Sequence, residues 1–266
     1  MNGPFSLPFV SLGSRATLFY RLWRRDLQER YTGTWLGWFW LVLHPCSCCC
    51  CIPWCLVKSA VRFGAATSTG DFAVYLFAGL LAFNAFAEVV TRAPVLLSER
   101  RDLLRNTPLP PALLPLLPVA TSVVLEGLAL LILLLALLGR GELQVLTLLY
   151  YWPFLLIRVL LSMAAAYLLA PLGVFLRDLR QMVPVLLTVL LFTSPILYPL
   201  EVIPERFLGW YDWNLFGQLV QGYRDALLLG QLDGGRCLGL LLVALLLLAF
   251  AVSVFRSLMT PVRQVL

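Results

Sequence analysis

Residues 24–51 read RRDLQERYTGTWLGWFWLVLHPCSCCCC, and this stretch decides which kind of fold the chain adopts. A charged run from Arg24 to Arg30 leads into an apolar segment rich in tryptophan, which ends with five cysteines within six positions. Basic residues beside an apolar span commonly set the topology of a membrane protein, because they gather on the cytoplasmic side. The stretch therefore predicts a first membrane span from about residue 34.

The composition of the whole chain also favours a membrane protein. Of the 266 residues, 61% are hydrophobic and 13% are charged, whereas soluble domains carry about 45–50% apolar and about 25% charged residues. A soluble fold of this length has too little interior to bury so much apolar surface. The net charge of +6 is therefore attributed to basic residues beside apolar spans, with no nucleic-acid partner expected.

Six segments are long and apolar enough to cross a bilayer, which takes about 20 apolar residues per helix. They cover residues 34–57, 72–94, 112–138, 148–174, 182–199 and 238–256. An even number of spans places both termini on one side of the membrane. With the N-terminus in the cytoplasm, 13 basic residues lie inside and 6 outside, which agrees with the positive-inside rule. The sequence predicts an all-α, multi-pass protein with both termini in the cytoplasm.

We expect a single transmembrane domain over residues 1–266. It is divided into an interface segment, five spans, an external segment, and the last span with its tail, at 1–33, 34–199, 200–237 and 238–266. Within the interface segment, residues 14–31 have the pattern of an amphipathic helix that lies on the cytoplasmic face of the membrane. A solvated helix that simply precedes the first span is the alternative. The charged residues of this helix are Arg21, Arg24, Arg25, Asp26 and Arg30.

Several kinds of chemistry are missing from the sequence. A phosphate-binding P-loop needs a glycine-rich run before a lysine, but Lys58 is the only lysine and follows CIPWCLV. His44 is the only histidine, and the chain has no Asp-x-Asp motif. The chain is therefore not a P-loop ATPase, and energy for uphill transport must come from a partner or an ion gradient.

The cysteines between Cys46 and Cys55 have two interpretations. Several of them share a helical face, so metal ligation is geometrically conceivable. Thiolates are costly in hydrocarbon, however, and no further Cys-x-x-Cys pair completes a site. Because cysteine also behaves as a small hydrophobic residue, we favour helix packing and expect no metal site.

Two stretches carry a more specific signal than composition. They are RRDLQERYTGTWLGWFWLVLHP at 24–45 and GVFLRDLRQMVPVLLTVLLFTSPILYPLEVIPERFLGWYDWNLFGQLVQGYRDALL at 173–228. In order, spacing and topology they resemble the membrane subunit of ABC-2 type exporters of lipid-linked polysaccharides, such as O antigens, teichoic acids and capsules. The resemblance rests on Phe-x-Arg-Asp before the fifth span, Ser194-Pro195, Tyr198-Pro199, Ile203-Pro204 and Tyr223-Arg224. Leu215 departs from the family, whose members commonly have proline after the asparagine.

The resemblance implies a homodimer in the bacterial cytoplasmic membrane with two ATP-binding subunits beneath it. ATP and Mg²⁺ would be bound by those subunits, so no cofactor is expected on this chain. The cargo would be an undecaprenyl-linked polysaccharide, and membrane lipids surround the assembly. The segment between the second and third spans corresponds to the family's coupling helix, with Glu99, Arg100, Arg101, Asp102 and Arg105. A solvated loop is the alternative for this segment, and the interface helix would contact either the ATPase or anionic lipid headgroups.

A path for a sugar polymer should offer aromatic surfaces, because sugar rings have apolar faces. The candidate lining residues are Trp35, Trp38, Phe39, Tyr75, Phe83, Phe86, Phe192 and Tyr198, although Trp and Tyr also form belts at membrane interfaces. The external segment is too charged to cross the bilayer and is expected to form short re-entrant or interfacial helices. The resemblance makes these helices a gate, with breaks at Pro195, Pro199 and Pro204.

Two ionisable residues, Glu126 and Arg158, lie inside predicted spans. Their depths in the membrane differ by only roughly 3 Å at 1.5 Å per residue. We expect them to pair, as a structural lock in preference to a proton relay. Glu88 and Arg92 are expected to form a local pair one helical turn apart.

The sequence thus predicts the permease of a polysaccharide exporter and not an enzyme. An ABC-2 exporter of a drug or a plain lipid is the nearest alternative. A membrane-embedded enzyme of glycan or lipid metabolism, or an inert scaffold, is a more distant one, since catalytic motifs are missing and the segment 99–105 is densely charged.

Overall fold

The computed structural model describes residues 12–31, 69–106, 110–141, 145–198, 206, 209, 211 and 213–265. These residues form helices, turns and bends without a β-strand, so the all-α prediction is confirmed for them. Within these ranges, four helices are long and apolar enough to cross a membrane. They are α3 (Thr69–Glu99), α5 (Leu116–Arg140), α6 (Val145–Phe175) and α10 (Gly234–Val265). The predicted first span, 34–57, lies outside the described residues.

The predicted fifth span differs from the structure. Helix α7 (Leu179–Thr193) has 15 residues and therefore measures about 22 Å, which is shorter than the roughly 30 Å hydrocarbon core. It ends because Ser194 has an extended conformation, with φ −83° and ψ 138°, as expected for a residue that precedes proline. The helix therefore ends six residues before the predicted boundary at 199, at the break that was predicted for Pro195.

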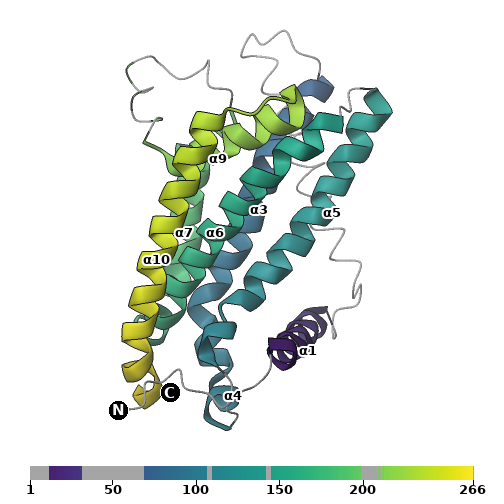
Figure 1. The fold of residues 1–266 in the computed structure, drawn as a ribbon. Coiled ribbons are helices and arrows are strands. Elements are labelled where there is room, and N and C mark those ends of the chain that lie inside the picture. The colour runs from purple at the N-terminus through teal and green to yellow at the C-terminus, as the bar shows by residue number, and fades with distance from the viewer. Residues whose placement is uncertain are drawn as a thin grey trace.

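Helix α6 forms the centre of the bundle, packed between α3 and α10 (Figure 1). Its backbone approaches α3 so closely that a Cβ atom on Gly173 would overlap the backbone of Pro94. Helix α10, by contrast, presents large apolar residues such as Leu242, Leu246 and Phe250 on its exposed surface. This distribution suits a helix that borders lipid, because lipid solvates apolar side chains.

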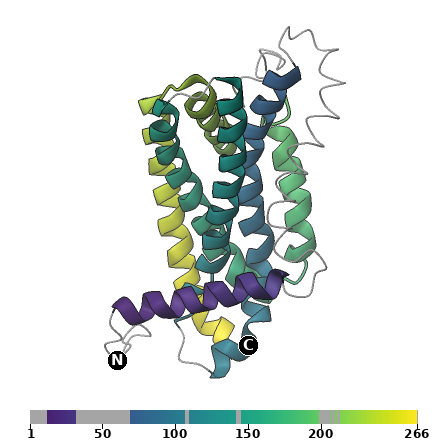
Figure 2. The ribbon, with the colours of Figure 1, turned by 90° about the vertical axis from the view of Figure 1, so that its right-hand side faces the viewer.

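Helix α1 (Leu12–Tyr31) crosses one end of the bundle, next to α4 (Arg101–Asn106) (Figure 2). The helix predicted at 14–31 is therefore confirmed. Its apolar residues Leu18, Leu22 and Trp23 pack against a buried cluster that includes Leu97 and Leu117. A short 3-10 helix (Pro111–Leu113) then leads into α5.

Helix α9 (Leu215–Arg224) lies at the opposite end of the bundle (Figure 1). It begins at Asn214, whose Oδ1 accepts a hydrogen bond from the backbone N–H of Gly217 at 2.9 Å. This N-cap starts the helix without the proline that family members commonly have at position 215. The helix continues as a π-helical turn, Asp225–Leu229, which ends at Gly230 with φ 60°.

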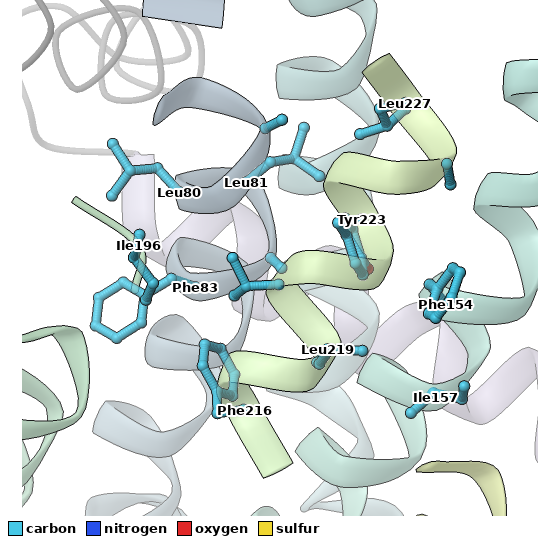
Figure 3. Packing of buried hydrophobic residues seen from close by; sticks show 14 of the residues in the cluster. Leu80, Leu81, Phe83, Phe154, Ile157, Ile196, Phe216, Leu219, Tyr223 and Leu227 are labelled. Atoms are coloured by element: carbon cyan, nitrogen blue, oxygen red, sulfur yellow. The ribbon is translucent and has the colours of Figure 1, made fainter. Parts of the chain in front are cut away.

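The buried face of α9 fills the space between α3 and α6. Figure 3 shows Phe216 beside Phe83 of α3, and Leu219 and Tyr223 facing Phe154 of α6.

Just before α9, the hydroxyl of Tyr211 donates to the carbonyl of Gly217 at 3.2 Å, and burial raises the pKa of Tyr211 to about 12. The external segment therefore contains a packed helix, while its re-entrant course and its role as a gate stay predictions.

Candidate functional site

A buried ion pair joins α5 to α6. Arg158 Nη2 pairs with Glu126 Oε2, and both side chains are 0% exposed. Arg158 Nη1 also donates to Ser122 Oγ at 2.9 Å. Each charge is neutralised by the other in a place where a single charge would be costly. The structure thus brings together the two residues that were expected to pair.

Two tyrosines complete this network. The hydroxyls of Tyr223 and Tyr151 donate to Glu126 Oε1 at 2.7 and 2.9 Å. Tyr223 belongs to α9, so the carboxylate of Glu126 links α5 and α6 to the external segment. Sequence reasoning named Tyr223 only as part of a family motif and did not name Tyr151. Tyr151 could have been found, because it precedes Arg158 by two helical turns and therefore lies on the same face.

Arg224, the last residue of α9, is also buried, at 2% exposed. Its guanidinium donates to the carbonyls of Pro195 and Ile196 at 2.7 Å each, and to the hydroxyl of Tyr75 at 2.8 Å. It also donates to the carbonyl of Tyr75 at 3.3 Å, and its Cζ lies 3.6 Å from the centre of that ring. These contacts hold α9 to α3 and to the turn after α7. The sequence had marked Arg224 only as part of a family motif.

The candidate aromatic residues of α3 have different surroundings in the single chain. Tyr75 holds Arg224, and Phe83 is buried with its ring centre 5.9 Å from that of Phe216. Phe86 lies 5.1 Å from the same ring and lines an apolar cavity of about 480 Å³. The cavity lies between α6, α7, α10 and the start of α9, and its other lining residues include Leu168, Leu190, Trp213, Asn214 and Phe250.

The remaining aromatic candidates lie elsewhere. Phe192 is 60% exposed near the end of α7, and Tyr198 donates its hydroxyl to the carbonyl of Phe192 at 2.9 Å. The candidates Trp35, Trp38 and Phe39, the gate prolines Pro199 and Pro204, and the cysteines from Cys46 to Cys55 lie outside the described residues. Among the gate prolines, Pro195 is described, and it stands where α7 ends.

The end of the bundle next to α1 carries a second charged cluster. Asp26 of α1 accepts a hydrogen bond from Arg100 Nη2 at 2.8 Å, and its other oxygen lies 3.9 Å from Arg92 Nη1. Trp23 Nε1 donates to Thr121 Oγ1 of α5 at 3.2 Å. Arg92 also makes the expected local pair with Glu88, at 3.3 Å. Helix α1 is therefore fastened to α3 and α5 by polar contacts as well as by packing.

The charged residues predicted for coupling and for the interface helix divide into two groups. Asp26 and Arg100 face each other within the chain, because α1 lies against the C-terminal end of α3 and the start of α5. Asp26 therefore does not point outward with the arginines of its helix. The exposed residues are Arg21, Arg24, Arg25, Glu99, Arg101 and Asp102. The side chains of Arg30 and Arg105 lie outside the described residues.

Comparison with known proteins assigns a family to this arrangement. The pattern of the ABC-2 type transporter family matches residues 17–228. The O-antigen export system permease protein RfbA of Myxococcus xanthus is 30% identical over 189 residues, 71% of each chain. A Klebsiella pneumoniae protein of the same name is 24% identical over 93% of this chain and 94% of its own. The polysialic acid transport protein KpsM of Escherichia coli is 24% identical over 89% of this chain and 91% of its own. The chain therefore belongs to the ABC-2 type transporter family, as a multi-pass membrane permease.

Proposed function

We propose that this chain is the membrane subunit of an ATP-driven exporter that carries a lipid-linked polysaccharide across the bacterial cytoplasmic membrane. The observation that carries the proposal is its similarity, over 93% of its length, to a permease named for O-antigen export. Two further relatives are named for export of O antigen and transport of polysialic acid, which are both glycans.

The proposed assembly is a homodimer with two ATP-binding subunits that bind ATP and Mg²⁺. The cargo is an undecaprenyl-linked glycan, and both termini of the chain lie in the cytoplasm. The clustering of α1 and α4 at one end of the bundle supports a docking face for the ATPase at that end (Figure 2). The exposure of Arg101 and Asp102 at that end supports a contact with the ATPase there. Arg100 pairs with Asp26.

Helix α9 is proposed to cover the outer end of the polymer path. Its support is the position of α9 at the end of the bundle away from α1 and α4, together with its close packing on α3 and α6. Aromatic side chains of the candidate set would contact the sugar rings when the path is open.

The function is tested by deleting the chain in its host and measuring both surface polysaccharide and the lipid-linked pool inside the cell. We expect the surface polymer to disappear and the intracellular pool to accumulate, and the wild-type chain to restore both. The double variant R101E/D102K should not restore export, although its abundance in the membrane should equal that of the wild type. The matched control is R180Q, which removes an exposed charge outside segment 99–105.

Other outcomes point to other functions. An unchanged surface polymer would contradict the proposed cargo and favour a drug or a plain lipid. Loss of the intracellular precursor together with the surface polymer would favour a role in glycan synthesis. Full restoration of export by R101E/D102K would contradict the assignment of segment 99–105 to coupling.

A further inference from the structure

We propose that Arg224 is a positioning residue that keeps α9 seated on α3 while the transporter rests, and that its contacts release during transport while Tyr223 stays bound to α5. The inference rests on the proposed function, because it takes α9 to close the outer end of the polymer path. It assigns Arg224 as the contact that releases, called the latch, and Tyr223 as the contact that is kept, called the pivot.

The contacts of Arg224 have the character of a releasable latch. Its guanidinium donates to three backbone carbonyls, those of Tyr75, Pro195 and Ile196, and to one phenol hydroxyl. All four acceptors are neutral, so withdrawal of the guanidinium leaves no buried carboxylate without its partner. Water or the hydroxyls of a passing polymer can replace such acceptors, because they are neutral oxygens and the guanidinium offers five N–H donors.

Gly79 of α3 provides the room for this latch. A Cβ atom at position 79 would lie 2.8 Å from Arg224 Nη2 and 3.3 Å from Cζ. The guanidinium therefore lies directly on the backbone of α3, and a side chain at position 79 would make the guanidinium shift away from its present acceptors. Ile196, whose carbonyl receives Nη2, is fully buried at the same place.

Tyr223 makes a different kind of contact on another side of α9. Successive residues of a helix point about 100° apart, so Tyr223 faces α5 and α6 while Arg224 faces α3. The hydroxyl of Tyr223 binds Glu126, whose other oxygen pairs with Arg158. Both contacts are charge-assisted, but loss of the Tyr223 hydroxyl would remove a donor from a carboxylate that stays buried, whereas withdrawal of Arg224 leaves only neutral acceptors behind. Tyr223 is accordingly the pivot, and Arg224 is the contact that opens.

The position of the latch on α3 connects it to the inner end of the molecule. Helix α3 is continuous from Thr69 to Glu99, with Gly79 and Tyr75 near one end and Arg92 near the other. Arg92 and Arg100 hold Asp26 of α1 at that inner end. A shift of α1 or α4 against the ATPase would therefore move the helix on which Arg224 rests. The contacts of α9 are thus placed to respond to events on the cytoplasmic side.

The test is passive leakage of the resting complex. The permease is purified together with its ATP-binding subunits, reconstituted in proteoliposomes, and assayed for release of trapped carboxyfluorescein without ATP. We expect R224Q to leak at least about tenfold faster than the wild type, because loss of the latch shifts the closed–open equilibrium toward the open state. G79A should leak similarly although it keeps Arg224, and R224K should be intermediate, because lysine keeps the charge without the planar fork.

Two controls separate a latch from a general structural role. R236Q removes another partly buried arginine of the external segment, which pairs with Asp225 at 2.5 Å and not with α3, and it should remain as tight as the wild type. The double variant G79A/R224Q should leak no more than R224Q alone, because both changes remove the same contact.

Tight vesicles with assembled R224Q and G79A would overturn the proposal, and so would equal leakage through R236Q. Failure of R224Q, R224K and G79A all to assemble, with R236Q intact, would also overturn it, because Arg224 would then be required for folding. Leakage does not depend on the cargo. If the variants leak while the deletion strain keeps its surface polysaccharide, the proposed cargo is contradicted. The proposal for Arg224 is then still supported.

Discussion

Glu126 carries a buried carboxylate in the interior of the described bundle. One of its oxygens is bound by the arginine of α6, and the other accepts hydrogen bonds from tyrosines of α6 and α9. A single carboxylate therefore joins three helices. Its burial makes it costly to keep without these partners.

Replacing Glu126 with methionine should destabilise the permease by about 3–5 kcal/mol, because Arg158 would be left buried and unpaired. The single variant R158M should have a similar effect. The double variant E126M/R158M should lose less stability than the sum of the two single losses, by about 0.5–3 kcal/mol. The measurement is the thermal unfolding midpoint in detergent together with abundance in the membrane. Strict additivity of the two changes would contradict the pairing.

Gly222 is a second residue whose replacement should have a clear effect on stability. A Cβ atom at this position would overlap the ring of Phe154, because α9 packs directly on α6. G222A should therefore cost about 1–3 kcal/mol through overpacking, read as a lower unfolding midpoint. The matched control is G239A in α10, where no atom lies within 4 Å of the added Cβ and where alanine should stabilise the helix by up to about 1 kcal/mol. Equal effects of the two changes would contradict the close packing of α9.

At the scale of elements, α1 illustrates how one residue fixes the position of a whole helix. Its apolar face and Trp23 pack on the C-terminal end of α3 and the start of α5, and Asp26 contacts Arg92 and Arg100. Neutralising Asp26 should loosen the helix without unfolding the bundle.

Tryptic cleavage of α1 measures that loosening. In D26N, cleavage after the exposed residues Arg24 and Arg25 should be at least about 5-fold faster, as a loss of 1 kcal/mol or more implies. D102N, which changes an exposed carboxylate of α4, should leave the cleavage rate unchanged. Equal cleavage of D26N and the wild-type chain would show that the Asp26 contacts do not hold α1.

Sequence patterns predicted some elements well and others poorly. The spans expected at 72–94 and 238–256 correspond to α3 and α10, because long apolar runs leave little choice of structure. The fifth span was overextended, since the conformational restriction before Pro195 outweighed the apolar character of the residues that follow. The end of α3 also came later than expected, because Pro94 is accommodated within the helix.

The candidate site was predictable where its residues share a helix or a depth in the membrane. Glu126 and Arg158 could be paired from their distances to the loop that joins their helices. Tyr223 is 97 positions from Glu126, and Arg224 is 149 positions from Tyr75. Contacts over such separations depend on the packing of α9 between α3 and α6, which periodicity alone does not reveal.

At the scale of the whole molecule, the two ends of the bundle should lie on opposite sides of the membrane. Trp213, which precedes α9, is 90% exposed, whereas Arg101 lies at the end with α1 (Figure 1). In a chain whose native cysteines are replaced, an impermeant maleimide should label W213C in intact cells and R101C only after the membrane is opened. The reverse pattern would contradict a cytoplasmic position for both termini.

The pairing of Glu126 with Arg158 has a consequence for how the chain is made. The two residues are 32 positions apart on helices joined by a short connection at residues 141–144, so they leave the ribosome within one helical hairpin. The hairpin can pass from the translocon into lipid with its two charges already matched. Tyr223 is synthesised much later and adds its hydroxyl only when α9 is present. The α5–α6 hairpin is therefore neutral when it joins the earlier helices α1 and α3, and the Glu126 network is completed only when the external segment has been made.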